Sequence, residues 1–224
     1  MAYDNYLAAG VHIGMKQQTK DMRKFIYKTR PDGIAILNVS LIDERIKTAA
    51  KFLSRFNRMM AVSRKGIGQR PTQKFASVLN SKANIGRFLP GTITNPAFPG
   101  YFEPQAMIVV DPMVDRQAVK EAVKMRIPII SLCDTFNETG NVDLVIPCNN
   151  KGRKSLGMVL YTLALEIKKA RGEIKEDSEF PYKTEEWEAD EEVYEERRDE
   201  DERRPRRQGF GGKSSDRRPA DRSR

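Results

Sequence analysis

The sequence predicts an α/β fold: a Rossmann-like, doubly wound parallel sheet with helices on both faces, followed by a charged C-terminal tail. Short apolar runs alternate along residues 33–170 with longer segments whose apolar residues recur at helical spacing. Right-handed crossovers between parallel strands then place helices on both faces of the sheet. After residue 172 the chain carries charge in place of apolar runs.

Five apolar runs predict the strands. They are short and rich in β-branched residues, which is typical of strands that are buried on both faces. The runs are "GIAILNV" (33–39), "MMAVS" (59–63), "QAMIVVD" (105–111), "IPIISLC" (127–133) and "VDLVIPC" (142–148).

Four segments between and after these runs predict helices. Residues 41–58 follow Ser40, a residue type that often caps a helix, and their apolar residues recur at helical spacing. Residues 71–83 begin with Pro71, which is favoured at a first helical position. Apolar residues from Val114 to Val123 mark a third, amphipathic helix, and 153–170 predict a long apolar one.

Charge divides the chain into a body and a tail. Residues 1–102 carry a net charge of +12, and 103–172 carry +2. Residues 173–202 then carry −12, and 203–224 carry +7. We interpret 1–172 as a folded body, 173–202 as an acidic tail segment, and 203–224 as an Arg-rich end that is disordered on its own.

The overall composition points to an anionic partner. The net charge is +9 and the pI is about 9.5, which favours nucleic acid or a membrane surface as that partner. No apolar run reaches the roughly 18 residues that a membrane span needs. The first residues lack a signal-peptide pattern, and two cysteines make no disulfide framework, so we expect a cytoplasmic protein.

Two stretches resemble phosphate-binding loops without matching them. "GIGQRP" (66–71) has two glycines of a dinucleotide-binding pattern but Pro71 in place of the third. "PCNNKGRKS" (147–155) has Pro147 where a P-loop has its first glycine, and Arg153 separates Gly152 from Lys154. We therefore expect neither to hold a mononucleotide, although Lys151, Arg153 and Lys154 near a helix start suit a phosphate oxygen.

Asp111, Asp115 and Asp134 lie near predicted strand ends, where doubly wound enzymes place their sites. A metal-binding or acid–base role is one interpretation. The alternative is structural, because an Asp in a first helical turn often caps the helix. His12 is the single histidine, and we expect it to be packed or to face RNA.

Basic residues are concentrated where acidic ones are missing. After Asp43 and Glu44 no carboxylate occurs until Glu103, so the cations between them repel one another unless an anion neutralises them. On the predicted helix 41–58, four of them are spaced to form one stripe: Lys47, Lys51, Arg55 and Arg58. The N-terminal segment adds Lys16, Lys20, Arg23, Lys24, Lys28 and Arg30, interleaved with Phe25 and Tyr27. This mixture suits phosphate pairing and base stacking.

Four blocks of the sequence resemble one family. "LAAGVHIG" (7–14), "RFLPGTITNP" (87–96), "IVVDPMVDRQAVKEAVKMRIPIISLCDT" (108–135) and "VDLVIPCNNKGRKSLG" (142–157) resemble the small-subunit ribosomal protein "S-two" family. The resemblance is to its archaeal branch. Bacterial members carry a long helical hairpin after the "TN" block, whereas here only about ten residues separate Asn95 from Gln105.

The resemblance implies an RNA-binding structural protein of the small ribosomal subunit with no enzymatic activity, cofactor, metal or small-molecule substrate. Its partners would be ribosomal RNA and other small-subunit proteins, on cytoplasmic ribosomes. The glycine loop at 66–68 would belong to an RNA-facing surface, and "RFLPGTITNP" would supply polar RNA contacts or loop bonds. To the residues above, this adds Arg64, Lys65, Arg70, Lys74, Arg87, Thr92, Thr94 and Asn95 as expected RNA-binding residues.

Two other interpretations stay open on the sequence. One is a nucleotide-binding enzyme on the same fold, since a fold does not fix a function. The other is a protein-interaction or adhesion module. In the acidic tail, Trp187 and Tyr194 are seven residues apart, so a helix would place both on one face, and we expect them to anchor a neighbouring protein.

Overall fold

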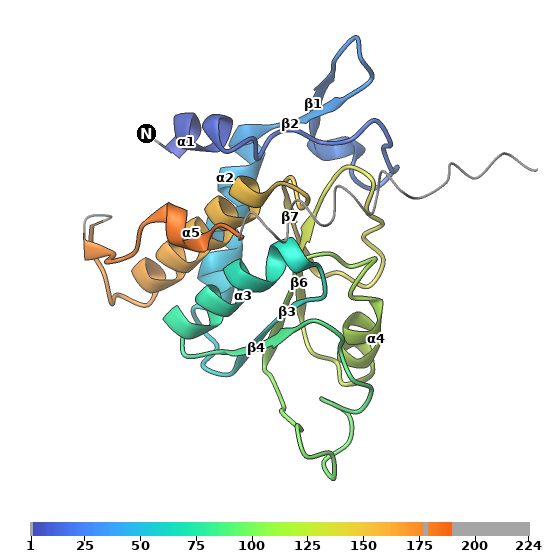
Figure 1. The fold of residues 1–224 in the computed structure, drawn as a ribbon, viewed down its shortest axis with the longest axis vertical. Helices are drawn as coiled ribbons and strands as arrows, with labels where there is room; N and C mark the ends of the chain where they lie inside the picture. The colour runs from blue at the N-terminus through green and yellow to red at the C-terminus, as the bar shows by residue number, and fades with distance from the viewer. Residues whose placement is uncertain (1, 177–178, 190–224) are drawn as a thin grey trace, which may run out of the picture.

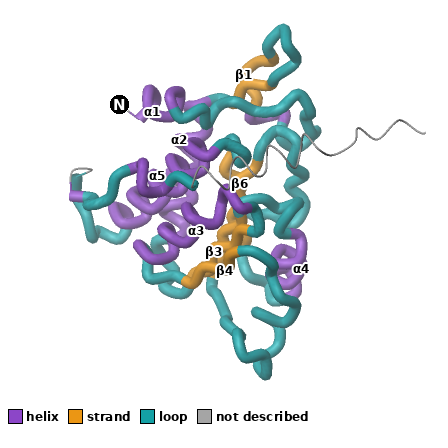
Figure 2. Tube along the Cα trace, viewed as in Figure 1, coloured by secondary structure: helices purple, strands orange, loops and turns teal. Residues whose placement is uncertain are grey.

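A computed structural model of the chain describes residues 2–176 and 179–189, and Tyr194 and the Arg-rich end at 203–224 lie outside them. A five-stranded parallel sheet forms the centre (Figures 1 and 2). Its strands, in spatial order, are β4 (Lys82–Ile85), β3 (Met59–Ser63), β5 (Ala106–Val109), β6 (Ile129–Cys133) and β7 (Leu144–Pro147). This order confirms the predicted α/β class.

The strand order creates a switch point between β3 and β5. From β3 the chain crosses to β4 on one side, and then returns to β5 on the other. The connections that leave β3 and β5 therefore run in opposite directions from the carboxyl ends of two neighbouring strands. Such a switch point leaves a crevice at the carboxyl ends of the two strands, and in doubly wound proteins ligands bind there.

Two apolar cores lie on opposite faces of the sheet. Alternate residues of β3 serve the two cores: Met59 and Ala61 belong to the larger one, and Met60 and Val62 to the smaller one. The larger core is covered by α2 (Val39–Leu53), α3 (Gly66–Val78) and α5 (Arg153–Ala170). The smaller core is covered by α4 (Arg116–Lys124) and by the long connection from β4 to β5 (Figure 1).

The run at 33–39 lies outside the main sheet. It contains β2 (Ala35–Leu37), which pairs antiparallel with β1 (Ile26–Thr29) in a separate hairpin at the top of Figure 1. The short helix η1 (Arg23–Phe25) precedes this hairpin, and α1 (Ala2–Ala8) begins the chain. β1 and the edge strand β4 were not predicted, because exposed or half-buried residues interrupt their apolar pattern.

The stretch "GIGQRP" is the start of α3 and not a loop before it. The helix begins at Gly66, so Pro71 lies inside it and not at its first position. A Cβ on Gly68 would lie 2.3 Å from Ser63 Oγ and 3.2 Å from Val110 Cγ1. Gly68 therefore allows α3 to pack closely against the ends of β3 and β5, and this contact explains the glycine without a phosphate.

The folded body extends beyond residue 172, so the predicted boundary falls too early. Phe180, Trp187 and Ala189 are buried in the larger core. Residues 184–187 form the short helix η3 (Thr184–Trp187), which packs on α5. Across the described ranges, no helix combines the length and the apolarity that crossing a bilayer requires.

Candidate nucleic-acid interface

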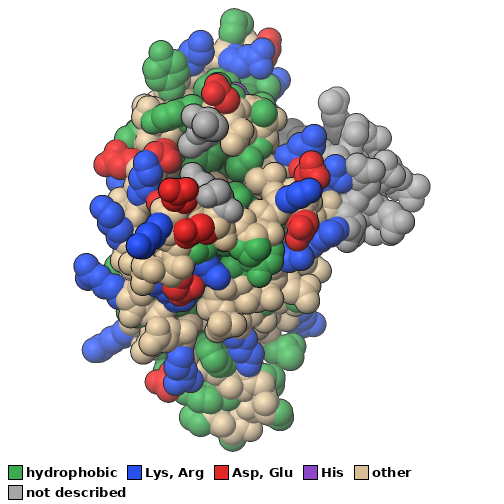
Figure 3. All heavy atoms as spheres, turned by 90° about the vertical axis from the view of Figure 1, so that its left-hand side faces the viewer, with side chains coloured by type: hydrophobic (Ala, Val, Ile, Leu, Met, Phe, Trp, Pro, Cys, Tyr) green, Lys and Arg blue, Asp and Glu red, His purple; other side chains and the backbone are tan. Residues whose placement is uncertain are grey.

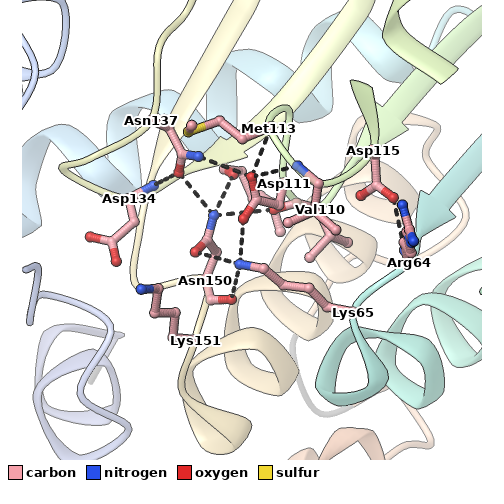
Figure 4. Close-up of polar contacts among 12 residues, drawn as sticks. Arg64, Lys65, Val110, Asp111, Met113, Asp115, Asp134, Asn137, Asn150 and Lys151 are labelled. Carbon is pink, nitrogen blue, oxygen red and sulfur yellow. Dashed lines mark hydrogen bonds and ion pairs between the residues drawn. The ribbon is translucent and has the colours of Figure 1, made fainter. Parts of the chain in front are cut away.

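Side chains of the protein itself fill the crevice at the switch point (Figure 4). Lys65 follows β3 and Asp111 follows β5, and both are buried. Lys65 Nζ lies 2.5 Å from Asp111 Oδ2. The expectation that Lys65 binds RNA is therefore wrong: its ammonium group points into the protein and is neutralised by an internal carboxylate.

Two buried asparagines close a ring around this ion pair. Lys65 Nζ donates to Asn150 Oδ1 at 3.0 Å and to the Asn150 carbonyl at 3.1 Å. Asn150 Nδ2 donates to Asn137 Oδ1 at 3.0 Å, and Asn137 Nδ2 donates to Asp111 Oδ1 at 2.9 Å. We call these four residues the Lys65–Asp111 ring. They link the ends of β3, β5, β6 and β7 at the place where a related enzyme would bind its ligand.

The carboxylates of the other two candidate aspartates lie outside the ring and serve local structure, although the Asp134 N–H donates to Asn137 Oδ1 and the Asp115 N–H to the Asp111 carbonyl. Asp115 Oδ1 accepts a hydrogen bond from the Arg64 backbone N–H at 2.8 Å, which ties the start of α4 to the end of β3. Asp134 Oδ1 accepts one from the Thr135 N–H at 2.6 Å. Among the residues that the structure describes, no group of three or more His, Cys, Asp and Glu side chains is placed to hold a metal ion.

The carboxyl group of Asp115 titrates at a higher pH than that of an exposed aspartate, because it is buried. Desolvation raises the pKa of its carboxyl group from 3.8 to about 6, although hydrogen bonds from backbone N–H groups oppose this shift. Burial also raises the pKa of Asp134. Because the folded pKa of Asp115 exceeds its unfolded pKa, the stability that it contributes is fully present below pH 3.8 and is lost as pH rises through about 6.

We therefore expect Asp115→Asn to gain stability relative to the wild type as pH rises from about 3.5 to 7. Two pKa units correspond to roughly 3 kcal/mol at full effect. Urea unfolding of both proteins at several pH values measures the difference, in which the contribution of Asp134 cancels. A difference that stays constant across pH 6 would contradict the assignment.

The N-terminal basic segment lies at the same edge of the sheet as the ring. The Met15 N–H donates to Thr135 Oγ1 at 2.9 Å, and the Thr19 N–H donates to the Thr135 carbonyl at 2.9 Å. Thr19 Oγ1 also donates to the Asn137 carbonyl. These bonds tie residues 15–19 to the segment after β6, and thereby bring the first basic residues of the chain to the carboxyl ends of the strands.

Exposed cations surround the filled crevice. We define the carboxyl-edge surface as the exposed basic residues that follow β3, β4 and β7, together with those of the N-terminal segment tied to them. They are Lys16, Lys20, Arg64, Arg87, Lys151 and Lys154. Four further predicted residues are exposed on η1 and the β1–β2 hairpin: Arg23, Lys24, Lys28 and Arg30. His12 is half-buried just before this segment.

The predicted four-residue helix stripe is divided. Helix α2 ends at Leu53, so Arg55 and Arg58 lie beyond it, near the start of β3 and the opposite edge of the sheet. Lys47 forms an ion pair with Asp43, with 2.8 Å between Nζ and Oδ2. The Arg58 guanidinium lies over the Phe102 ring at 5.3 Å. The stripe is therefore not one surface, because the chain turns away before its last two members.

The segment "RFLPGTITNP" mostly binds itself and α4. Thr92 is buried, and its hydroxyl donates to the Leu89 carbonyl at 2.7 Å, so the expectation that it contacts RNA is wrong. Thr94 Oγ1 lies 3.2 Å from Glu121 Oε2, and Asn95 Oδ1 accepts from the Ala97 N–H. Glu121, which sequence analysis did not single out, is buried and also accepts the Gly91 N–H at 3.0 Å.

Trp187 is fully buried against its own chain. Its ring lies 5.8 Å from that of Tyr161 on α5, and Phe180 and Tyr182 complete the aromatic group. This burial contradicts the expectation that Trp187 anchors a neighbouring protein. Tyr194, the second expected anchor, lies outside the described residues.

Comparison with known proteins identifies the family. The family model described as "Ribosomal protein S2" matches residues 101–170. The small ribosomal subunit protein uS2 of the archaeon Haloquadratum walsbyi is 49% identical over 171 residues, which cover 75% of this chain and 61% of that relative. The chain thus spans about three fifths of the length of this curated relative. The chain belongs to the ribosomal protein S2 family, in its archaeal branch.

Proposed function

We propose that this protein is a structural component of the small ribosomal subunit, and that it binds ribosomal RNA and neighbouring ribosomal proteins without catalysing a reaction. Its place is then the cytoplasmic ribosome. One observation carries the proposal: the ligand crevice of the fold is filled by the Lys65–Asp111 ring, while the cations around it are exposed. The archaeal relative is a small ribosomal subunit protein, and this similarity supports the same role.

The filled crevice also argues against a nucleotide-binding enzyme. A coenzyme phosphate would have to displace Lys65 from Asp111, and its backbone cradle would need the glycine positions that Pro71 and Pro147 occupy. Exposed Lys and Arg side chains instead lie at two edges of the sheet and on the β1–β2 hairpin. This arrangement suits a phosphate backbone, which offers many anions over a large surface.

Because this contact is through phosphates, we expect RNA affinity to fall steeply with salt. Each neutralised phosphate contributes about −0.7 for single strands and about −0.9 for duplex to the slope of log affinity against log salt. Titration of small-subunit RNA at several salt concentrations measures this slope. The variant K16Q/R64Q/R87Q/K151Q replaces four cations by neutral glutamines, so the magnitude of this slope should fall by about three to four. A slope near zero for the wild type would contradict phosphate binding.

Incorporation into the subunit tests the structural role directly. Particles reconstituted from small-subunit RNA and proteins, with and without this chain, are separated by sedimentation. The chain should co-sediment with the particle at moderate salt. A smaller fraction of the quadruple variant K16Q/R64Q/R87Q/K151Q should co-sediment under the same conditions. If the chain stays at the top of the gradient under conditions in which other subunit proteins assemble, the proposed role is wrong.

A further inference from the structure

Residues 179–189 form a segment whose short helix η3 packs on α5 and contacts α3, and we call this segment the C-terminal strap. Trp187 seats it, since this side chain is fully buried among Tyr161, Phe180 and Tyr182. Gly157 on α5 allows the close approach, because a Cβ there would lie 2.9 Å from the Trp187 carbonyl oxygen. The strap is therefore fixed by aromatic packing and a backbone contact.

The packing of Trp187 places two carboxylates of the strap next to cations of the body. Glu186 Oε2 lies 3.5 Å from Lys74 Nζ on α3, and Glu188 Oε2 lies 3.5 Å from an Arg153 guanidinium nitrogen at the first residue of α5. Both cations belong to the set that the sequence predicts to bind RNA phosphates. On this side of the molecule, acidic side chains lie among Lys and Arg (Figure 3).

These two ion pairs are of a kind that an external anion can replace. The Lys74 and Glu186 side chains are 39% and 45% exposed, and an ion pair of this sort contributes at most about 1 kcal/mol. The Arg153–Glu188 pair is partly exposed as well. Because Trp187 holds the strap independently, both carboxylates can turn away from their cations without release of the strap.

A groove shows where the anion would lie. It has a volume of about 590 Å³ and runs along the exposed side of α3, where Gln69, Arg70, Gln73 and Lys74 line it. Ala189, the last described residue of the strap, forms part of its wall. A strand of RNA in this groove would meet Lys74 only in place of Glu186.

We propose that the C-terminal strap is an internal mimic of RNA: its Glu186 and Glu188 carboxylates occupy phosphate positions on Lys74 and Arg153 until RNA displaces them. The inference rests on the proposed RNA-binding function and adds its regulation. The strap weakens binding to RNA that cannot displace both carboxylates, and thereby favours RNA that makes additional contacts elsewhere on the protein.

The test uses the full chain and an unstructured oligouridylate labelled with fluorescein. Affinity is measured by anisotropy at several salt concentrations for the wild type, E186Q, E188Q and the double variant E186Q/E188Q. Glu185→Gln is the matched control, because Glu185 neighbours Glu186 on η3, is exposed, and makes no ion pair with the described body. Thermal unfolding confirms that each variant is folded.

Each neutralised carboxylate removes one competitor for phosphate, so E186Q should steepen the log–log salt slope by about 0.7, and E188Q and the double variant should shift it in the same direction. Their affinities at low salt should rise severalfold, while E185Q keeps the wild-type slope. Equal, steep slopes for all five proteins would overturn the strap proposal and leave RNA binding intact. Slopes near zero for all five would overturn both.

Discussion

Lys65→Met should destabilise the protein by about 3–5 kcal/mol at neutral pH, because it leaves the Asp111 carboxylate buried without its counter-charge. Asp111 is inaccessible to solvent, and Lys65 is its ion-pair partner within the described chain. The loss also removes the donor that Asn150 Oδ1 and its carbonyl share. Urea unfolding followed by circular dichroism gives the free energy of unfolding.

Two further variants make this prediction specific. In K65M/D111N the charge is absent, and the asparagine Oδ1 can still accept from the Met113 N–H and from Asn137. The double variant should therefore be more stable than the sum of the two single losses predicts, by about 1–3 kcal/mol. Arg64→Met changes the neighbouring exposed cation and should stay within about 0.5 kcal/mol of the wild type. Equal losses for K65M and R64M would mean that the ring does not stabilise the fold.

The buried elements of the fold were predictable because burial leaves a simple pattern. Helix α5 spans 153–170 as predicted, and β3, β5, β6 and β7 lie within the predicted runs. β3, β5 and β6 are buried along their whole length, so their sequences are continuous apolar runs. The pattern is local, and it needs no knowledge of which strands become neighbours.

Elements that depend on distant partners were not predictable in this way. β1 is largely exposed, and it is a strand only because it pairs with β2 across a turn at Gly33. The start of α3 contains two glycines, which have low helix propensity. Close packing of Gly68 against Ser63 and Val110 outweighs that propensity, and this contact joins segments that are far apart in the sequence.

The candidate interface was predictable as a composition but not as a geometry. Arg64 and Lys65 are adjacent cations in the sequence, yet Arg64 is exposed and Lys65 is buried. The difference arises from Asp111, Asn137 and Asn150, which three other strands bring to Lys65. In the acidic tail, Trp187 was recognisable as an anchor, but its partner was not: it packs on Tyr161 of its own chain and not on a neighbouring protein.

Trp187→Ala should cost about 3 kcal/mol or more of stability, since it leaves a cavity between α5 and the strap. Trp187→Phe should cost much less: the indole N–H has no hydrogen-bond partner among the described residues, so packing provides most of the contribution of this side chain. Urea unfolding of the two variants and the wild type measures both losses. Similar losses for Ala and Phe would contradict the assignment of this contribution to packing.

Gly157→Ala tests the same seat from the side of α5 and keeps the tryptophan as a reporter. Trp187 is the single tryptophan of the chain, so its emission reports on the strap alone. The new Cβ would lie 2.9 Å from the Trp187 carbonyl oxygen and 3.1 Å from its carbonyl carbon, and backbone atoms cannot move aside as a flexible side chain can. The strap must therefore shift, and we expect red-shifted emission and stronger quenching by iodide than in the wild type. Gly140→Ala is the control, because no atom lies within 4 Å of a Cβ at that position. Unchanged emission in G157A, with a body as stable as that of G140A, would show that the strap does not pack on α5.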